Sequence, residues 1–476
     1  MRGKCIVVLL DGTWNDSDAG NTDTNIVRLR ELIAASLDQD DPAQSADNDF
    51  VKRRTFNGRP VVLYYDRGVG TGGFLDKYLG GALGAGLERG VRRAYRFLSN
   101  TYDPDDEVYI FGFSRGAYTA RSLAGFMAVA GLLRRRENNA INESRAWDYY
   151  RTNPKDRLQP VANQLRGLGH EVSSPLISCL GVFDTVGARG IPIRWFWREN
   201  RDLFEFHDVE LSTISQTNLH ALAIDEHRES FQATIWRRPA FLDISSSTEQ
   251  VWFVGAHADI GGGYINDYDR VIDVPGKVQV VRKGLDDISL DWMIKRVKAH
   301  HPAFPLRASA LLFGEEQKAI DQTWALRGVQ HEAREGIYRV FPFALRSIGN
   351  SSTRFGAWSR QRFVSQDRHA SPIGEMVHIS ALERWGKVFN SGWIERSYEP
   401  RNLRLAFDRI RGTYSEASNK EPKKPEPPEP LYVVGWSGHR LEPSDSKSRA
   451  TVQGFMDAAL RREGHDPGQR GEGKRK

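Results

Sequence analysis

The chain has 476 residues, of which 39% are hydrophobic and 27% are charged, with a formal net charge of +6. This length suits one large α/β domain with additions, and the composition excludes a largely disordered chain. The basic residues are spread along the chain, which argues against a nucleic-acid-binding groove. Cys5 and Cys179 each lie in an apolar run. Two such thiols make no disulfide framework, so we expect a reducing compartment.

The N-terminus lacks the pattern of a secretory signal. The apolar run Cys5–Leu10 is short and enters an Asp-Gly turn, whereas a signal peptide needs a longer apolar region and a small-residue cleavage site. The sequence has no stretch close to the roughly 20 apolar residues of a membrane span. We therefore expect a cytoplasmic protein, or one that is exported by a route independent of a signal peptide.

Apolar, β-branched runs alternate with helical patterns along the first 280 residues. The predicted strands are Cys5–Leu10, Val61–Tyr65, Glu107–Phe113, Leu176–Phe183 and Val251–Gly255. The predicted helices are Thr24–Leu37, Leu75–Asn100, Gly116–Leu133 and Val209–Ile224. This alternation predicts an α/β fold with a mostly parallel sheet covered by helices on both faces. Ligands of such sheets bind beyond the carboxyl ends of the strands.

The pattern is less regular after about residue 280. Asp291–His300 and Glu375–Val388 are predicted helices, and Leu431–Gly438 is a candidate docking strand. Ser418–Pro430 is rich in Pro, Lys and Glu, which is typical of a linker. We predict a catalytic domain over residues 1–300, a C-terminal extension packed on the core over 301–415, a linker over 416–430 and a mostly disordered tail over 431–476.

The stretch IFGFSRGAYTA, Ile110–Ala120, contains the pattern G-x-S-x-G. Ser114 follows a predicted strand and precedes a small-residue helix, with Gly112 and Gly116 two residues away on either side. This context is typical of a nucleophile elbow, in which a strained turn exposes the serine hydroxyl above the sheet. The alternative is a glycine-rich structural bend.

A serine nucleophile needs a base, and the base needs an orienting acid, in the chain order Ser, Asp or Glu, His for this architecture. Asp184 ends the apolar run in LISCLGVFDTVGARG, and His257 ends the run in VWFVGAHADIGGGY. We predict Asp184 as the acid and His257 as the base, because a strand end followed by glycines suits an exposed catalytic loop.

Several residues compete for these two roles. His378, in EMVHISALERW, is the main rival base because it also lies beside apolar residues. Asp225 and Asp259 are rival acids, although Asp259 is also placed to cap the glycine turn after His257. Other histidines, including His220, fall in helical or solvent-facing patterns.

The oxyanion needs backbone donors. One is the N–H of Arg115, and the second is expected from the loop LLDGTWND, Leu9–Asp16, through Gly12 or Thr13. Asp11 and Asn15 would support this loop. The ending D-G-T also looks like the first motif of haloacid-dehalogenase-type phosphatases, but the position of their nucleophilic aspartate is occupied by Leu9, which cannot form an aspartyl-phosphate.

Two further segments have weaker signals. Tyr64–Gly73 is glycine-rich but lacks the lysine of a P-loop, so a plain turn is favoured over a phosphate site. Gly190–Asp208 carries closely spaced aromatic residues, which suit a cap over an acyl pocket, a face that touches membrane lipid, or ordinary packing on the core. We expect no metal, because the sequence has no H-E-x-x-H, C-x-x-C or calcium-loop spacing, and no organic cofactor.

The ordered set DGTWND, GVGT, GFSRGAYTARSLAG, FDTVG and GAHADIGGGY resembles the type VI secretion phospholipase-effector-like catalytic domain family. The resemblance covers about residues 3 to 300. It implies an α/β-hydrolase fold with a Ser-Asp-His triad, in which Ser114, Asp184 and His257 match the family motifs. It also implies an ester or phospholipid substrate, because characterised relatives cleave membrane phospholipids and are delivered as antibacterial toxins.

The sequence thus predicts a serine esterase or lipase, with transient contact with a membrane surface and with a secretion-system or immunity partner as expected interactions. Two alternatives stay open. One is a binding protein on a hydrolase scaffold without a productive triad. The other is a phosphoryl-transfer enzyme that uses DGTWND and GVGTGG.

Overall fold

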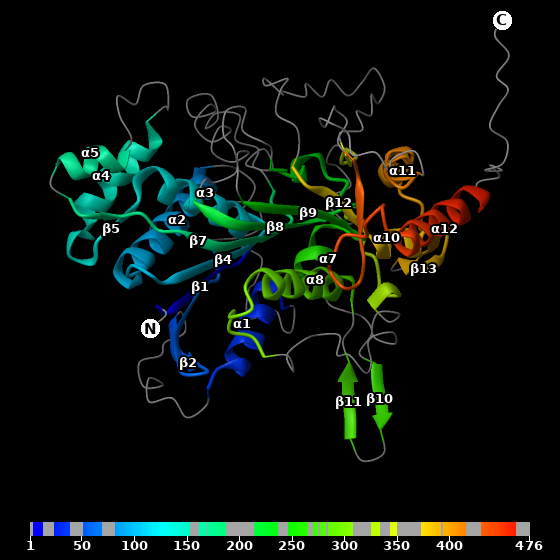
Figure 1. Ribbon diagram of the computed structural model, residues 1–476, viewed down its shortest axis with the longest axis horizontal. Coiled ribbons are helices and arrows are strands. Elements are labelled where there is room, and N and C mark those ends of the chain that lie inside the picture. Colours follow the sequence, from blue (N-terminus) through cyan, green and yellow to red (C-terminus); the bar gives the residue numbers. More distant parts are fainter. Residues whose placement is uncertain are drawn as a thin grey trace, which may run out of the picture.

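The computed structural model of the chain is drawn in Figure 1. It describes residues 3–12, 23–38, 51–68, 81–152, 161–168, 170–186, 214–236, 246–264, 270–274, 277–281, 284–307, 325–333, 343–349, 373–391, 394–415 and 430–462.

A nine-stranded sheet forms the centre of the molecule (Figure 1). Its strands, in spatial order, are β15 (Tyr432–Val434), β12 (Glu375–His378), β9 (Ser247–Phe253), β8 (Ser215–Ala223), β7 (Ile177–Phe183), β4 (Glu107–Phe113), β1 (Cys5–Leu10), β3 (Arg59–Asp66) and β2 (Val51–Phe56). Neighbouring strands run parallel, except that the edge strand β2 is antiparallel to β3. The predicted mostly parallel α/β fold is therefore confirmed.

Side chains of the central strands alternate between two hydrophobic cores. In β1, Cys5, Val7 and Leu9 enter one core, whereas the intervening Ile6, Val8 and Leu10 enter the other. This period of two follows from the pleat of a strand. Because both faces are covered, β1 is apolar along its whole length, which is why its sequence shows a continuous run rather than an alternation.

Helices cover each face. One face is covered by α2 (Gly81–Thr101), α3 (Arg115–Ala130), α4 (Ala140–Arg151) and α5 (Val161–Gly167). The other is covered by α1 (Asn25–Ser36), α8 (Leu285–His300), α10 (Ile379–Arg384), α11 (Arg401–Thr413) and α12 (Ser446–Arg462). The short helix α7 (His257–Gly261) follows β9. Three small antiparallel pairs complete the described elements: β5 (Leu132–Leu133) with β6 (Val172–Ser173), β10 (Arg270–Val274) with β11 (Lys277–Val281), and β13 (Val388–Ser391) with β14 (Ile394–Ser397).

The helix predicted over Val209–Ile224 is wrong, because this part of the chain contains the central strand β8. The polar residues that suggested a solvent-facing helix are buried and bonded. Asn218 contacts the side chains of Ser215, Ser246 and Thr248. His220 contacts Thr185 and Gln250 and is not solvent-facing. The tertiary environment overrides the local pattern here.

The predicted helix Glu375–Val388 is wrong in its first part, which forms β12 before α10 begins at Ile379. The predicted docking of Leu431–Gly438 as a strand is confirmed by β15, which pairs with β12. The mostly disordered tail predicted over 431–476 is wrong over residues 431–462, because β15 and α12 bury Val433 and Met456 in the core. The predicted linker over residues 416–430 lies almost entirely outside the described residues.

The domain boundary predicted at residue 300 stays a prediction. One hydrophobic core contains both Trp292 and Phe407, so the elements on either side of that boundary pack together.

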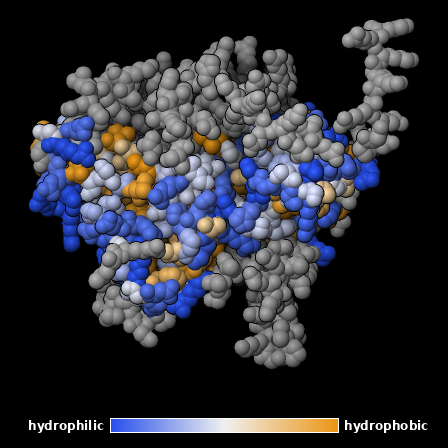
Figure 2. All heavy atoms as spheres, in the orientation of Figure 1, coloured by the Kyte–Doolittle hydropathy of each residue, from blue (hydrophilic) through white to orange (hydrophobic). Residues whose placement is uncertain are grey.

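The described surface in Figure 2 is mostly hydrophilic, with hydrophobic side chains in small separate groups.

Candidate active site

Ser114 lies in a sharp turn between β4 and α3. Its backbone angles, φ 56° and ψ −119°, fall outside the regions that L-residues ordinarily adopt. The turn requires glycine on both sides of the serine. A Cβ at Gly112 would lie 2.5 Å from the Gly116 carbonyl oxygen, and a Cβ at Gly116 would lie 2.1 Å from the Leu10 carbonyl oxygen. The G-x-S-x-G pattern is therefore a packing requirement of this turn, and strain of this kind is common at functional sites.

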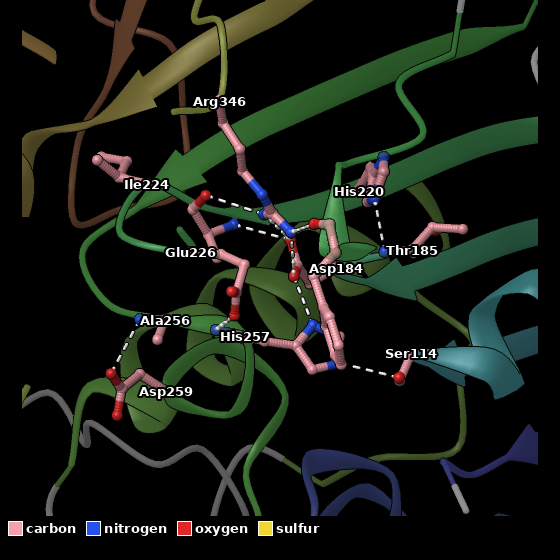
Figure 3. Close-up of polar contacts among 12 residues, drawn as sticks. Ser114, Asp184, Thr185, His220, Ile224, Glu226, Ala256, His257, Asp259 and Arg346 are labelled. Carbon is pink, nitrogen blue, oxygen red and sulfur yellow. Dashed lines mark hydrogen bonds and ion pairs between the residues drawn. The ribbon is translucent and has the colours of Figure 1, made fainter. Parts of the chain in front are cut away.

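Three predicted residues meet at the carboxyl ends of the strands (Figure 3). His257 lies between the other two: its Nε2 is 2.8 Å from Ser114 Oγ, and its Nδ1 is 2.5 Å from Asp184 Oδ2. Ser114 follows β4, Asp184 follows β7 and His257 begins α7 after β9. The three residues come from widely separated parts of the sequence, and the parallel sheet brings them to one edge.

Asp184 is fully buried and also has positive φ, 41°. Its Oδ1 accepts a hydrogen bond from the Ala223 backbone N–H at 3.0 Å. Arg346 donates to both carboxylate oxygens, from Nη1 to Oδ1 at 2.5 Å and from Nη2 to Oδ2 at 3.0 Å. Burial by itself raises the pKa of Asp184, but the Arg346 charge and the His257 contact outweigh burial and hold this pKa well below its usual range.

Arg346 is the main site residue that the sequence analysis missed. It is 1% exposed and comes from the segment FALRSIGN, beyond the last predicted motif near the site. The sequence around it has no glycine-rich turn or strand end that would point to a role. A buried arginine is recognisable only from the fold, because its partners are distant in sequence.

His257 is packed between aromatic rings. The ring of Phe113 lies 4.8 Å from the imidazole and that of Phe231 lies 5.2 Å away, edge-on. The His257 backbone N–H donates to Glu226, whose carboxylate also pairs with Arg228 at 2.7 Å. Burial lowers the pKa of His257 below its ordinary value, although Asp184 opposes this shift. The imidazole is therefore neutral near pH 7, as a proton acceptor must be.

The rival base and acids do not contact Ser114 in the structure. His378 bonds Ser380, and burial lowers its pKa to about 3. Asp225 accepts hydrogen bonds from the Gly255 N–H and the Tyr398 hydroxyl. Asp259 accepts a hydrogen bond from the Ala256 N–H, and its Oδ1 is 2.6 Å from His331 Nδ1. It therefore caps the turn at His257, which was the alternative to a role as the acid.

Two of the expected oxyanion donors, Arg115 and Gly12, lie next to Ser114. Arg115 is the first residue of α3, and the amides of a first helical turn have no acceptor within their own helix. Gly12 lies beside the serine: a Cβ at Gly12 would be 3.4 Å from Ser114 Cβ. The Gly12 N–H points to Asp11 Oδ1 at 2.7 Å. Asp11 also accepts from Thr24 and Tyr65 hydroxyls, so it fixes the start of this loop.

Other predicted features lie outside the described residues: Thr13, Asn15, the aromatic segment Gly190–Asp208 and most of the glycine-rich stretch after Tyr64. Among described residues, no group of three His, Cys, Asp or Glu side chains is placed to hold a metal ion. No described helix has the length and apolar character needed to cross a membrane.

Comparison with known proteins adds a family. Residues 4–296 match the family model "T6SS, Phospholipase effector Tle1-like, catalytic domain", where T6SS is the type VI secretion system. An uncharacterized protein of Saccharomyces cerevisiae is 26% identical over 251 residues, which cover 48% of this chain and 32% of that protein.

Two solved structures are also similar. One is an uncharacterized protein from Pseudomonas aeruginosa, with 19% identity and a TM-score of 0.36, covering 67% of this chain and 50% of the other. The second is the Tle1 effector bound to the VgrG spike of the Type 6 secretion system, with 21% identity and a TM-score of 0.27, covering 56% of this chain and 52% of the other. The chain thus spans about a third to a half of these relatives.

Proposed function

We propose that this chain, which belongs to the family of T6SS phospholipase effector Tle1-like catalytic domains, is a serine hydrolase that cleaves carboxylic ester bonds of phospholipids. The observation that carries the proposal is the continuous hydrogen-bonded chain from Ser114 through His257 to Asp184. A strained serine, a neutral buried imidazole and a carboxylate in this order are the parts needed for acyl transfer.

In the proposed reaction, Ser114 Oγ attacks the ester carbonyl while His257 Nε2 takes the hydroxyl proton. The resulting imidazolium is stabilised by Asp184, which holds the ring through Nδ1 and stays ionised throughout. The tetrahedral oxyanion would be held by the Arg115 N–H at the positive end of α3. The second donor is proposed to come from the Gly12 loop, after its amide turns from Asp11 toward the oxyanion.

Collapse of this intermediate breaks the ester C–O bond, and His257 gives its proton to the leaving alkoxide. A water molecule then attacks the acyl-enzyme while His257 accepts one of its protons. The bond from the acyl carbon to Ser114 Oγ breaks, His257 returns the proton to Oγ, and the fatty acid leaves. For a diacyl phospholipid the products are one fatty acid and one lysophospholipid.

Labelling with a fluorophosphonate probe tests the activated serine directly. The wild type is expected to label, and Ser114→Ala and His257→Ala are not. Ser122→Ala is the matched control, because Ser122 lies on the same helix and is buried, and its backbone carbonyl accepts a hydrogen bond from the Tyr150 hydroxyl. Absence of labelling in the wild type, with and without detergent, would favour the alternative of a binding protein on a hydrolase scaffold.

Phospholipid vesicles test the substrate. Mass spectrometry should find fatty acid and lysophospholipid, in yields that fall at least about 1000-fold in Ser114→Ala. Release of a phosphorylated headgroup, or metal-dependent phosphatase activity that survives Ser114→Ala, would point instead to phosphoryl-transfer chemistry. Delivery through a type VI secretion system is part of the proposal and predicts that periplasmic expression of the wild type, but not of Ser114→Ala, lyses bacteria.

A further inference from the structure

Arg346 has no role in the reaction steps proposed above, although it contacts the proposed acid Asp184. Its guanidinium donates to both oxygens of Asp184, and it also donates to the backbone carbonyls of Ala223 at 3.0 Å and Phe231 at 2.5 Å. The side chain is 1% exposed, and Figure 3 shows it reaching Asp184 from a direction different from that of His257. Bidentate Arg–carboxylate pairs are strong and geometrically specific.

The segment that carries Arg346 is bonded to the rest of the fold on both sides of this residue. Before it, Ala344 N–H donates to the His227 carbonyl at 2.9 Å, and Phe343 forms an isolated bridge with Arg228. After it, Gly349 N–H donates to Glu375 at 3.2 Å. The segment thus lies alongside the loop after β8, which also contains Glu226 and Phe231, both of which contact His257. It lies beyond residue 296, where the family match ends.

The two carboxylate oxygens of Asp184 have different partners, and only Oδ2 faces the proposed base. Oδ1 receives Ala223 N–H and Arg346 Nη1, whereas Oδ2 receives Arg346 Nη2 and faces His257 Nδ1. Without the guanidinium, Asp184 would be a buried carboxylate with one backbone donor and the imidazole. Such a group tends to take a proton, and a protonated acid no longer stabilises an imidazolium.

We propose that Arg346 is a positioning residue for the proposed hydrolysis: it keeps Asp184 ionised and turned toward His257, so that a segment beyond the residues of the family match completes the site. This inference rests on the proposed function. Arg346 acts through Asp184 and does not touch the reacting atoms.

Removal of the Arg346 charge should also change the pH at which the coupled Asp184–His257 pair takes up a proton. Glu226 and Arg228, in the loop after β8, act on His257, and His220 on β8 acts on Asp184. Asp259 lies on the same short helix as His257, and Arg121 on α3 lies near His220. Loss of the Arg346 cation makes uptake of a proton by the Asp184–His257 pair more favourable, whichever of the two residues holds it. A protonated pair cannot act as the base, so the fall of kcat/KM at low pH (its acidic limb) should move to higher pH.

The test compares Arg346→Met and Arg346→Lys with Arg384→Met in the full-length protein. Arg384 is the matched control because it is equally buried but donates to the carbonyls of Leu326 and Gly328, away from Asp184. We expect Arg346→Met to lower kcat roughly 10- to 100-fold and to raise the acidic limb by about one pH unit. Arg346→Lys should keep the wild-type limb, because the charge remains, with a smaller loss of kcat. Arg384→Met should leave the limb unchanged.

NMR titration of the His257 imidazole separates this inference from the proposed function, because it needs no turnover. An upward shift in Arg346→Met supports the inference even if no hydrolysis is found. The inference is overturned if Arg346→Met folds and has the kcat and the His257 titration midpoint of the wild type. It is also overturned if Arg346→Met and Arg384→Met lose kcat equally and neither changes the acidic limb of kcat/KM. If Arg346→Met does not fold, Arg346→Lys decides: a limb that moves despite the retained charge overturns the inference.

Discussion

The α-carbon of Gly116 lies so close to the backbone of Leu10 that a Cβ at position 116 would sit 2.1 Å from the Leu10 carbonyl oxygen. Gly116 is in the first turn of α3, and Leu10 ends the neighbouring strand β1. This contact brings the start of the serine helix against the Asp11–Gly12 loop. It fixes the distance between the two segments that are proposed to supply oxyanion donors.

Gly116→Ala should therefore destabilise the protein and reduce any Ser114-dependent activity. The new methyl group meets backbone rather than a flexible side chain, so the helix or the strand end must shift, at a cost of about 1–3 kcal/mol. Chemical denaturation measures this change. The control is Gly412→Ala on the exposed side of α11, where a Cβ meets nothing within 4 Å, and it should stabilise by up to about 1 kcal/mol. Equal stability of the two variants would contradict this account of the turn.

The pH dependence of ester hydrolysis should reflect the buried base. Burial lowers the pKa of His257 from its ordinary value of 6.5, with partial opposition from Asp184. The base must be neutral to accept the serine proton, so kcat/KM should stay level down to a pH below 6.5 and then fall. A neutral short-chain ester is the suitable substrate, because its own charge does not change over this range. An acidic limb centred above pH 6.5 would contradict the assignment of the environment of His257.

The sequence allowed much of the sheet to be predicted, and it also pointed to three residues that the structure brings together, for a physical reason. Strands buried on both faces are continuous apolar runs, and ligand-binding loops of parallel sheets come after the carboxyl ends of such strands. Ser114, Asp184 and His257 all lie shortly after runs of this kind. The ordered motifs also carried the resemblance that the family match confirms.

What the sequence could not provide were features defined by distant partners. In β8, His220 and Asn218 look solvent-facing until the neighbouring strands that bond them are known. Arg346 becomes significant only when the chain places it against Asp184. The edge strand β15 is three residues long and pairs with β12 across a long gap in sequence, so only its apolar character was visible.

Asp184 and Asp225 should respond differently to replacement by asparagine. Asp184→Asn should reduce activity by roughly three to four orders of magnitude, because an amide cannot stabilise the imidazolium or hold the required tautomer. Asp225→Asn should retain activity, since Asp225 bonds Gly255 and Tyr398 rather than His257. Kinetics with one ester substrate compares the two directly. The reverse order of effects would make Asp225 the acid.

Asp225 should also contribute to the pH dependence of stability. Burial raises its pKa to about 6, above the unfolded value near 3.9. The folded state therefore binds a proton more tightly, so this contribution favours folding at low pH and is lost as pH rises from about 4 through 6, by about 3 kcal/mol in total. In Asp225→Asn, the free energy of unfolding should fall less than in the wild type over this range. An unchanged slope in urea titrations at several pH values would count against a raised pKa.

The C-terminal helix α12 should contribute to the stability of the whole fold. Met456 is 2% exposed and belongs to the same hydrophobic core as β1, α8 and α11. Met456→Ala should lower the free energy of unfolding by about 2–5 kcal/mol, because it removes buried methylene groups and leaves a cavity. Thr451→Ala on the exposed face of the same helix should change it by less than about 1 kcal/mol. Denaturation monitored at the tryptophans reports on the core as a whole. If α12 is an integral part of the fold, Met456→Ala alone should show one unfolding transition at a lower denaturant concentration. Identical unfolding curves for the two variants would mean that α12 is attached to the fold without stabilising it.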